Sequence, residues 1–227
     1  MKLLKAALLF LSVLVGAPAM AQSIDTNPQW NGTTFISSFG VTDTATYGQI
    51  ITIFNPTVLF DYSFQIGNCN STGPVTFRGH IYAWNGTQAT GASLYDSPIQ
   101  TVPADAFYHR VTFTPPSAIP LNAGQYVLFA STSQDQGAAP LSACRWGALN
   151  NNTTYPFGNF VFINNNTNVA AWTSQPWSNI GEDLAFSATF PAFTPAPTLS
   201  PWNLALLALL LLGVALVATR WHFMRTR

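Results

Sequence analysis

The sequence predicts an all-β domain, a sandwich or a barrel, between two hydrophobic chain ends. Residues 22–190 contain short runs of alternating apolar and polar residues, and clusters of turn-forming residues separate these runs. The same stretch has no helical periodicity of useful length. Only 7% of the 227 residues are charged, compared with roughly 25% in ordinary soluble proteins, and the polar residues are mainly Asn, Thr, Ser and Gln, as in many secreted β-proteins.

Six runs in this stretch are predicted strands. Consecutive side chains of a strand point to opposite faces of the sheet, so each alternating run has an apolar and a polar face. Asn85-Gly86 follows the third run and predicts a hairpin turn. The six runs are 47–54, 60–66, 75–84, 107–113, 126–131 and 183–190.

The charged residues are unevenly distributed along the chain. All eight acidic residues lie between Asp25 and Asp183, together with only three bases, Arg78, Arg110 and Arg145. The middle domain is therefore net negative. Because nucleic-acid binding requires clustered Lys and Arg to neutralise phosphates, this composition argues against a nucleic-acid partner.

Residues 1–21 have the features of a secretory signal peptide. Lys2 and Lys5 precede an apolar run over residues 6–15, and Ala19-Met20-Ala21 provides the small residues of a cleavage site. We expect an N-terminal signal helix that engages the Sec translocon and signal peptidase, with cleavage before Gln22. The alternative is an uncleaved anchor helix.

The C-terminal end predicts one transmembrane helix over residues 202–219. This segment would be about 27 Å long as a helix, close to the ~30 Å hydrocarbon core of a bilayer. Trp202 and Trp221 bracket it as interfacial aromatic residues do. The positive-inside rule places the following arginines in the cytoplasm and the middle domain outside. These arginines, which act as a membrane stop, are Arg220, Arg225 and Arg227. The alternative, a buried core helix, would leave no polar stripe facing water.

The last thirty residues resemble a known bacterial sorting signal. A short motif before the helix, with terminal arginines after it, resembles the IPTL-CTERM signal, a relative of the PEP-CTERM type, of exported proteins in Gram-negative bacteria. The motif residues are Pro197, Thr198, Leu199, Ser200 and Trp202, and Ala196, Pro201 and Asn203 depart from the family pattern. The resemblance implies that residues 197–227 are recognised by an exosortase-type enzyme that cleaves near the motif. We expect a protein anchored in the inner membrane, then released to the cell surface or extracellular matrix. Residues 191–197 form a proline-rich, extended spacer.

Several segments of residues 22–190 together resemble a group of secreted bacterial jelly-roll domains. The resemblance implies a jelly-roll-like β-sandwich similar to carbohydrate-binding modules, and extracellular polysaccharide as a ligand class. The segments are 47–49, 82–86, 89–91, 94–95, 121–126 and 183–186.

Cys69 and Cys144 are the only cysteines of the chain. In an exported protein, two cysteines most simply form one disulfide. The alternative is a pair of buried thiols. Neither cysteine has a His or a second Cys at metal-ligand spacing, so we expect no metal at these residues.

Catalytic motifs are absent from the sequence, which has no G-x-S-x-G, H-E-x-x-H or P-loop pattern. The only adjacent acids, Glu182 and Asp183, would point to opposite faces of a strand, which does not suit a glycosidase pair. We therefore expect a protein that is not an enzyme and that has no cofactor. Calcium at Asp183 is the one metal alternative.

A candidate glycan-binding face follows the strand predicted over residues 75–84. Aromatic rings stack on the apolar faces of sugars, and Arg and His donate to sugar hydroxyls. The candidate residues are Arg78, His80, Tyr82 and Trp84, with Tyr108 and Arg110 on a later strand. The alternative is that Tyr82 and Trp84 pack under a loop while Arg78 pairs with a surface acid. Three functions remain open: a polysaccharide-binding surface or matrix protein, a secreted glycan-active enzyme on the same scaffold, and a structural adhesin without a small ligand.

Overall fold

The computed structural model describes residues 21–41, 44–69, 74–136, 143–151 and 153–192, together with 206–211 and 213. Residues Ala21–Ala192 belong to one compact unit. Among the described residues, no helix combines the length and the apolar character that crossing a membrane requires. Outside the described residues lie the predicted signal peptide except Ala21, most of the predicted transmembrane helix, and the sorting and membrane-stop residues Pro197, Thr198, Leu199, Ser200, Trp202, Arg220, Arg225 and Arg227.

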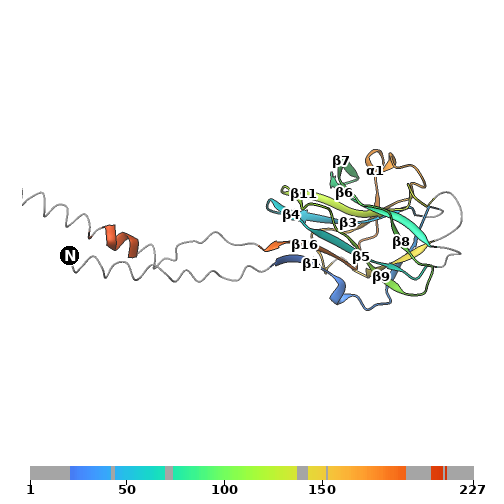
Figure 1. The fold of residues 1–227 in the computed structure, drawn as a ribbon, viewed down its shortest axis with the longest axis horizontal. Helices are drawn as coiled ribbons and strands as arrows, with labels where there is room; N and C mark the ends of the chain where they lie inside the picture. Colours follow the sequence, from blue (N-terminus) through green and yellow to red (C-terminus); the bar gives the residue numbers. More distant parts are fainter. Residues whose placement is uncertain are drawn as a thin grey trace, which may run out of the picture. The chain divides into compact units, whose positions relative to one another are not determined.

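The described domain consists mainly of antiparallel β-strands in two seven-stranded sheets, arranged as a sandwich (Figure 1). The predictions of an all-β domain and of a sandwich are confirmed. Two short helices accompany the sheets: η1 (Asn27–Gln29) and α1 (Ala171–Ser174). A small separate sheet pairs β4 (Thr57–Leu59) with β10 (Ile119–Leu121).

The first large sheet contains both ends of the domain. Its order is β1-β16-β5-β12-β15, with β2 paired to β12 and β9 paired to β5. Its strands are β1 (Ala21–Asp25), β2 (Phe35–Phe39), β5 (Asp61–Gly67), β9 (Tyr108–Phe113), β12 (Cys144–Leu149), β15 (Asp183–Leu184) and β16 (Phe186–Ala192). β16 lies between β1 and β5 and continues two residues into the predicted proline-rich spacer.

The second large sheet has the order β14-β13-β3-β11-β6-β7, with β8 also paired to β6. Its strands are β3 (Thr46–Ile53), β6 (Val75–Trp84), β7 (Ala89–Asp96), β8 (Gln100–Val102), β11 (Gly124–Ser131), β13 (Phe160–Ile163) and β14 (Ser178–Asn179). The predicted Asn85-Gly86 turn joins β6 to β7, and Gly86 has a φ of 101°, a conformation that favours glycine.

The main core lies between the two sheets and is rich in aromatic side chains. Tyr62 stacks on Phe113 with ring centroids 4.8 Å apart, and Phe64 lies 4.7 Å from Trp146. Gly79 of the second sheet faces this cluster, and a Cβ there would overlap the Phe113 ring. The alternation in the predicted strands therefore encodes an inner face that packs against the opposite sheet.

A second apolar cluster lies on the outer face of the second sheet. Residues 168–177, which include α1, cover this face, and we call them the cover segment. Val127 and Phe129 of β11 and Val161 of β13 pack there with Trp172 and Trp177 of the cover segment. Figure 1 shows α1 beside β7, which it contacts.

One disulfide joins Cys69, two residues after β5, to Cys144, the first residue of β12, with Cα atoms 4.0 Å apart. The predicted disulfide is confirmed, and the alternative of two buried thiols is excluded. The bond closes a loop across a sequence separation of 75 residues and fixes the ends of two neighbouring strands of the first sheet.

Candidate functional site

Arg78, His80, Tyr82 and Trp84 lie on the outer face of β6, as their alternation predicts. His80 is only 1% exposed, and its ring lies between Phe129 at 4.8 Å and Trp172 at 4.6 Å. Trp84 is 8% exposed and packs edge-on against Trp177. The cover segment therefore occupies most of the surface where a sugar would have to stack.

The Arg78 guanidinium and His80 Nδ1 also have partners inside the protein, whereas His80 Nε2 is buried and makes no hydrogen bond with any described residue. Arg78 Nε donates to Asp135 Oδ2 at 3.1 Å, and Arg78 Nη1 donates to the carbonyl oxygen of Ser97. His80 Nδ1 lies 2.6 Å from Asp96 Oδ1. These contacts agree with the alternative in which aromatic residues pack under a loop and Arg78 pairs with an acid.

Tyr108 and Arg110 lie on β9 in the first sheet, whereas the other four candidates lie on β6 in the second sheet. The six residues are therefore not gathered on one surface, and the single platform suggested by the sequence is not formed. Arg110 donates to the hydroxyl oxygens of Ser63 and Ser187 on its own sheet. Tyr108 belongs to a different site, a pocket on the outer face of the first sheet.

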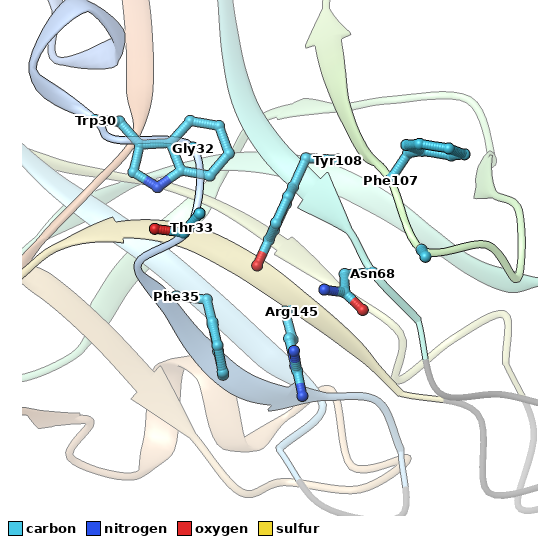
Figure 2. Close-up of a pocket in the computed structure, with 9 residues that line it drawn as sticks. Trp30, Gly32, Thr33, Phe35, Asn68, Phe107, Tyr108 and Arg145 are labelled. Carbon is cyan, nitrogen blue, oxygen red and sulfur yellow. The ribbon is translucent and has the colours of Figure 1, made fainter.

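This pocket has a volume of about 590 Å³ and is lined mainly by aromatic and polar side chains (Figure 2). Its position follows from the strand register, because Arg145 of β12, Gly67 of β5 and Tyr108 of β9 lie directly opposite one another. Phe35 of β2 lies opposite Gly147 of β12 in the same way. The lining residues are Trp30, Gly32, Thr33, Phe35, Asn68, Ala106, Phe107, Tyr108 and Arg145.

Glycines at two positions of the sheet make room for the Trp30 ring and for the backbone of Phe107 and Tyr108. A Cβ at Gly147 would lie 2.8 Å from the Trp30 ring, so the indole lies directly over the backbone of β12. A Cβ at Gly67 would overlap the carbonyl of Phe107. Trp30 is held further by its indole N–H, which donates to the carbonyl oxygen of Thr34 at 2.7 Å.

The aromatic residues of the pocket differ in exposure. Phe107 is 71% exposed and Phe35 is 41% exposed, so both rings present apolar surface to solvent. Trp30 and Tyr108 meet edge to face with centroids 5.0 Å apart. Partial burial raises the pKa of the Tyr108 hydroxyl, and the charge of Arg145 opposes that rise. This hydroxyl therefore stays protonated at neutral pH and can donate a hydrogen bond.

Arg145 provides the charge of the pocket. Its guanidinium lies 4.0 Å from the centroid of the Phe35 ring, a cation–π arrangement. None of the lining residues is acidic. The site therefore combines exposed rings, hydroxyls, an amide and one cation, which are groups that can bind a ligand.

The disulfide fixes the side of the pocket that Asn68 and Arg145 line. Asn68 immediately precedes Cys69, and Arg145 immediately follows Cys144. The backbone N–H of Asn68 donates to the carbonyl oxygen of Phe107 at 2.8 Å, and the Cys69 N–H donates to Asp105. These bonds hold the loop that carries Phe107 beside the covalent link.

Asp183, the residue suggested for calcium, is fully buried. Its carboxylate accepts hydrogen bonds from Gln49 Nε2 at 3.0 Å and from the Tyr155 N–H at 2.9 Å. Burial raises the pKa of this carboxyl. Within the described part of the chain, no group of three or more His, Cys, Asp or Glu residues could hold a metal ion. Calcium binding stays an untested expectation.

No protein-family model matches the chain, and no curated protein matches it. A search of solved structures finds a match to the crystal structure of the cysteine protease and lectin-like domains of Cwp84, a surface layer associated protein of Clostridium difficile. The sequence identity is 9% and the TM-score is 0.40. The match covers 66% of this chain and spans about a third, 33%, of that chain.

Proposed function

We propose that the protein is an exported surface or matrix protein whose sandwich, of the jelly-roll type, binds extracellular polysaccharide at the pocket around Trp30 and Arg145. One observation carries this proposal: exposed aromatic rings and hydrogen-bond donors, with no acidic residue among them, line one pocket. The signal peptide and the sorting signal suggested by the sequence supply the route to the surface.

Sugar chemistry fits the groups in the pocket. The C–H faces of a pyranose ring stack on exposed aromatic rings, here Phe35 and Phe107. The ring hydroxyls need hydrogen-bond partners, which the Asn68 amide, the Tyr108 hydroxyl and the Arg145 guanidinium can provide. A volume of about 590 Å³ lies within the range of roughly 300–1,000 Å³ common for small-ligand pockets. Since no carboxylate lines the pocket, these residues support binding better than glycoside hydrolysis.

The polysaccharide proposal is tested by affinity electrophoresis of the purified protein through gels that contain different polysaccharides. We expect Phe107→Ala to weaken retention in the gel of a bound polysaccharide at least about fivefold, which corresponds to about 1 kcal/mol. Phe54→Ala is the matched control, because Phe54 is 60% exposed but lies outside the pocket, against Phe157. Equal retention of the wild type and both variants, or no retention of the wild type in any gel, would contradict the proposal.

The export proposal has a separate test. The mass of the intact protein extracted from the cell surface should lack both the residues before Gln22 and the C-terminal peptide that contains Arg220. A surface protein that keeps the C-terminal peptide would exclude cleavage by an exosortase-type enzyme.

A further inference from the structure

We propose that the pocket selects an acidic sugar, a uronic acid whose carboxylate binds Arg145. This inference rests on the proposed polysaccharide binding and names the class of ligand. It begins from the three arginines of the domain, which differ in how their guanidinium groups are used.

Arg78 and Arg110 are already engaged by protein groups. Arg78 forms an ion pair with Asp135, and Arg110 donates to the hydroxyls of Ser63 and Ser187. The Arg145 guanidinium has the Phe35 ring beside it but makes no hydrogen bond or ion pair with any described residue. Its five N–H donors are therefore available, and a carboxylate can accept two of them in parallel.

A second unused donor lies in the same pocket. The Tyr108 hydroxyl is buried yet makes no hydrogen bond within the described part of the chain. Figure 2 shows this hydroxyl pointing toward the space beside Phe35 and Arg145. A buried polar group without a partner is costly, so a ligand atom that accepts its hydrogen bond recovers that cost.

The charge of the pocket gives the selectivity. The domain carries eight acidic residues, but the one charge on the pocket wall is the Arg145 cation. A neutral sugar seated there offers the guanidinium hydroxyl oxygens but no anion, so it compensates the lost hydration of the cation less well than a carboxylate does. A uronic acid supplies the anion in place of that water. The stacking rings then set which face of the sugar is bound, and the arginine sets which sugar is accepted.

The test compares two polymers with the same rings and different charge, polygalacturonate and its fully methyl-esterified form. We expect the wild type to bind the acidic form at least about tenfold more tightly than the ester. Arg145→Gln should abolish this difference, because it should weaken binding of the acidic form much more than binding of the ester. Arg110→Gln is the matched control, because it removes one positive charge from the same sheet outside the pocket and should preserve the preference.

The outcomes separate the inference from the proposal it rests on. If the wild type binds both forms equally, or binds only neutral polysaccharides, and Phe107→Ala still weakens binding, the acidic-sugar inference is overturned while polysaccharide binding stands. If Arg110→Gln lowers the preference as much as Arg145→Gln, the selectivity comes from net charge and the inference is also overturned. If no polysaccharide of either charge binds, both fail.

Discussion

Both sheets carry aromatic residues on their outer faces, but these residues are covered on the second sheet and line an open pocket on the first. On the second sheet, His80, Tyr82 and Trp84 alternate along β6, and the cover segment packs Trp172 and Trp177 onto that row. On the first sheet, Trp30, Phe35 and Tyr108 surround a pocket that solvent reaches. A row of aromatic residues along a strand therefore does not define a binding surface, because the segment that packs above it decides whether a ligand can reach the rings.

The neighbouring residues explain why only one of these faces is covered. Around His80, the strands contribute Val127, Phe129, Val161 and Ile163, a continuous apolar surface that gains stability when a segment excludes water from it. The outer face of the first sheet instead carries hydroxyls, arginines and the glycines beneath Trp30 and Phe107. Such a face can stay in contact with water.

The largest expected difference between the two faces is in stability. Trp172→Ala should lower the free energy of unfolding by about 3–5 kcal/mol, because it empties a buried aromatic site. It also removes the indole N–H donor that binds the Thr46 hydroxyl oxygen at 3.1 Å. Denaturant unfolding measures this loss.

Phe107→Ala provides the counterpart on the open face. Because Phe107 is 71% exposed, its replacement should change stability by no more than about 0.5 kcal/mol. A large loss of stability for Phe107→Ala, or no loss of stability for Trp172→Ala, would contradict the distinction between an open and a covered face.

The disulfide should affect both the stability and the pocket. Replacing Cys69 and Cys144 together by Ala should lower the free energy of unfolding by about 2–4 kcal/mol, since the unfolded chain regains the freedom of the long loop. Because Asn68 and Arg145 flank the bond, binding at the pocket should weaken as well. A double variant that loses stability but binds polysaccharide as the wild type does would show that the bond does not position the pocket.

Two His–Asp pairs provide a further comparison between the covered face and the open face. His80 lies under the cover segment with Asp96, whereas His109 pairs with Asp105 near the pocket, where its side chain is 38% exposed. Asp96→Ala should cost about 1–3 kcal/mol at pH 7, because it leaves the buried His80 Nδ1 without a partner. Asp105→Ala should cost much less stability than Asp96→Ala, because water replaces the lost partner of the exposed His109.

The pH dependence follows from the carboxyl groups. The hydrogen bond to His80 is the main cause that lowers the pKa of Asp96 in the folded state. A carboxyl whose pKa is lowered on folding stabilises the folded state. This contribution is complete above the usual pKa of the carboxyl, about 3.8 to 4, and it is lost as the pH falls through the lowered pKa of the folded state. The difference in the free energy of unfolding between the wild type and Asp96→Ala should therefore become smaller in acid. A gap that widens below pH 4 would contradict this assignment.

Strands with one buried face were predictable from the sequence. The alternating runs at 75–84 and 107–113 correspond to β6 and β9 almost residue for residue. β13 was not predicted, because Phe160–Ile163 is apolar on both faces and shows no alternation. β12 was not predicted either, since Arg145 is the one polar side chain in Cys144–Leu149, so the run shows little contrast between an apolar and a polar face.

Strands β2 and β12, neither of which was predicted from the sequence, explain why most of the pocket was missed. Of the sequence candidates, only Tyr108 lines it, and Phe35 and Arg145 come from β2 and β12. One clue was available, because the predicted disulfide places the neighbours of Cys69 and Cys144 side by side and so pairs Asn68 with Arg145. The cover segment could not be foreseen, since nothing local in residues 168–177 specifies the sheet face on which they pack.

The central position of β16 in the first sheet has a mechanical consequence. β16 ends the domain at Ala192, and it pairs with β1 on one side and with β5 on the other. Ala21 of β1 lies opposite Ala192, so tension between the two ends of the domain separates β1 from β16 starting at one end, and their hydrogen bonds open one at a time. Tension between Ala192 and an attachment near Phe186, at the far end of β16, would instead run parallel to the strand and load the hydrogen bonds on both of its sides in shear. In a single-molecule experiment, the second geometry should therefore rupture at a higher force than the first.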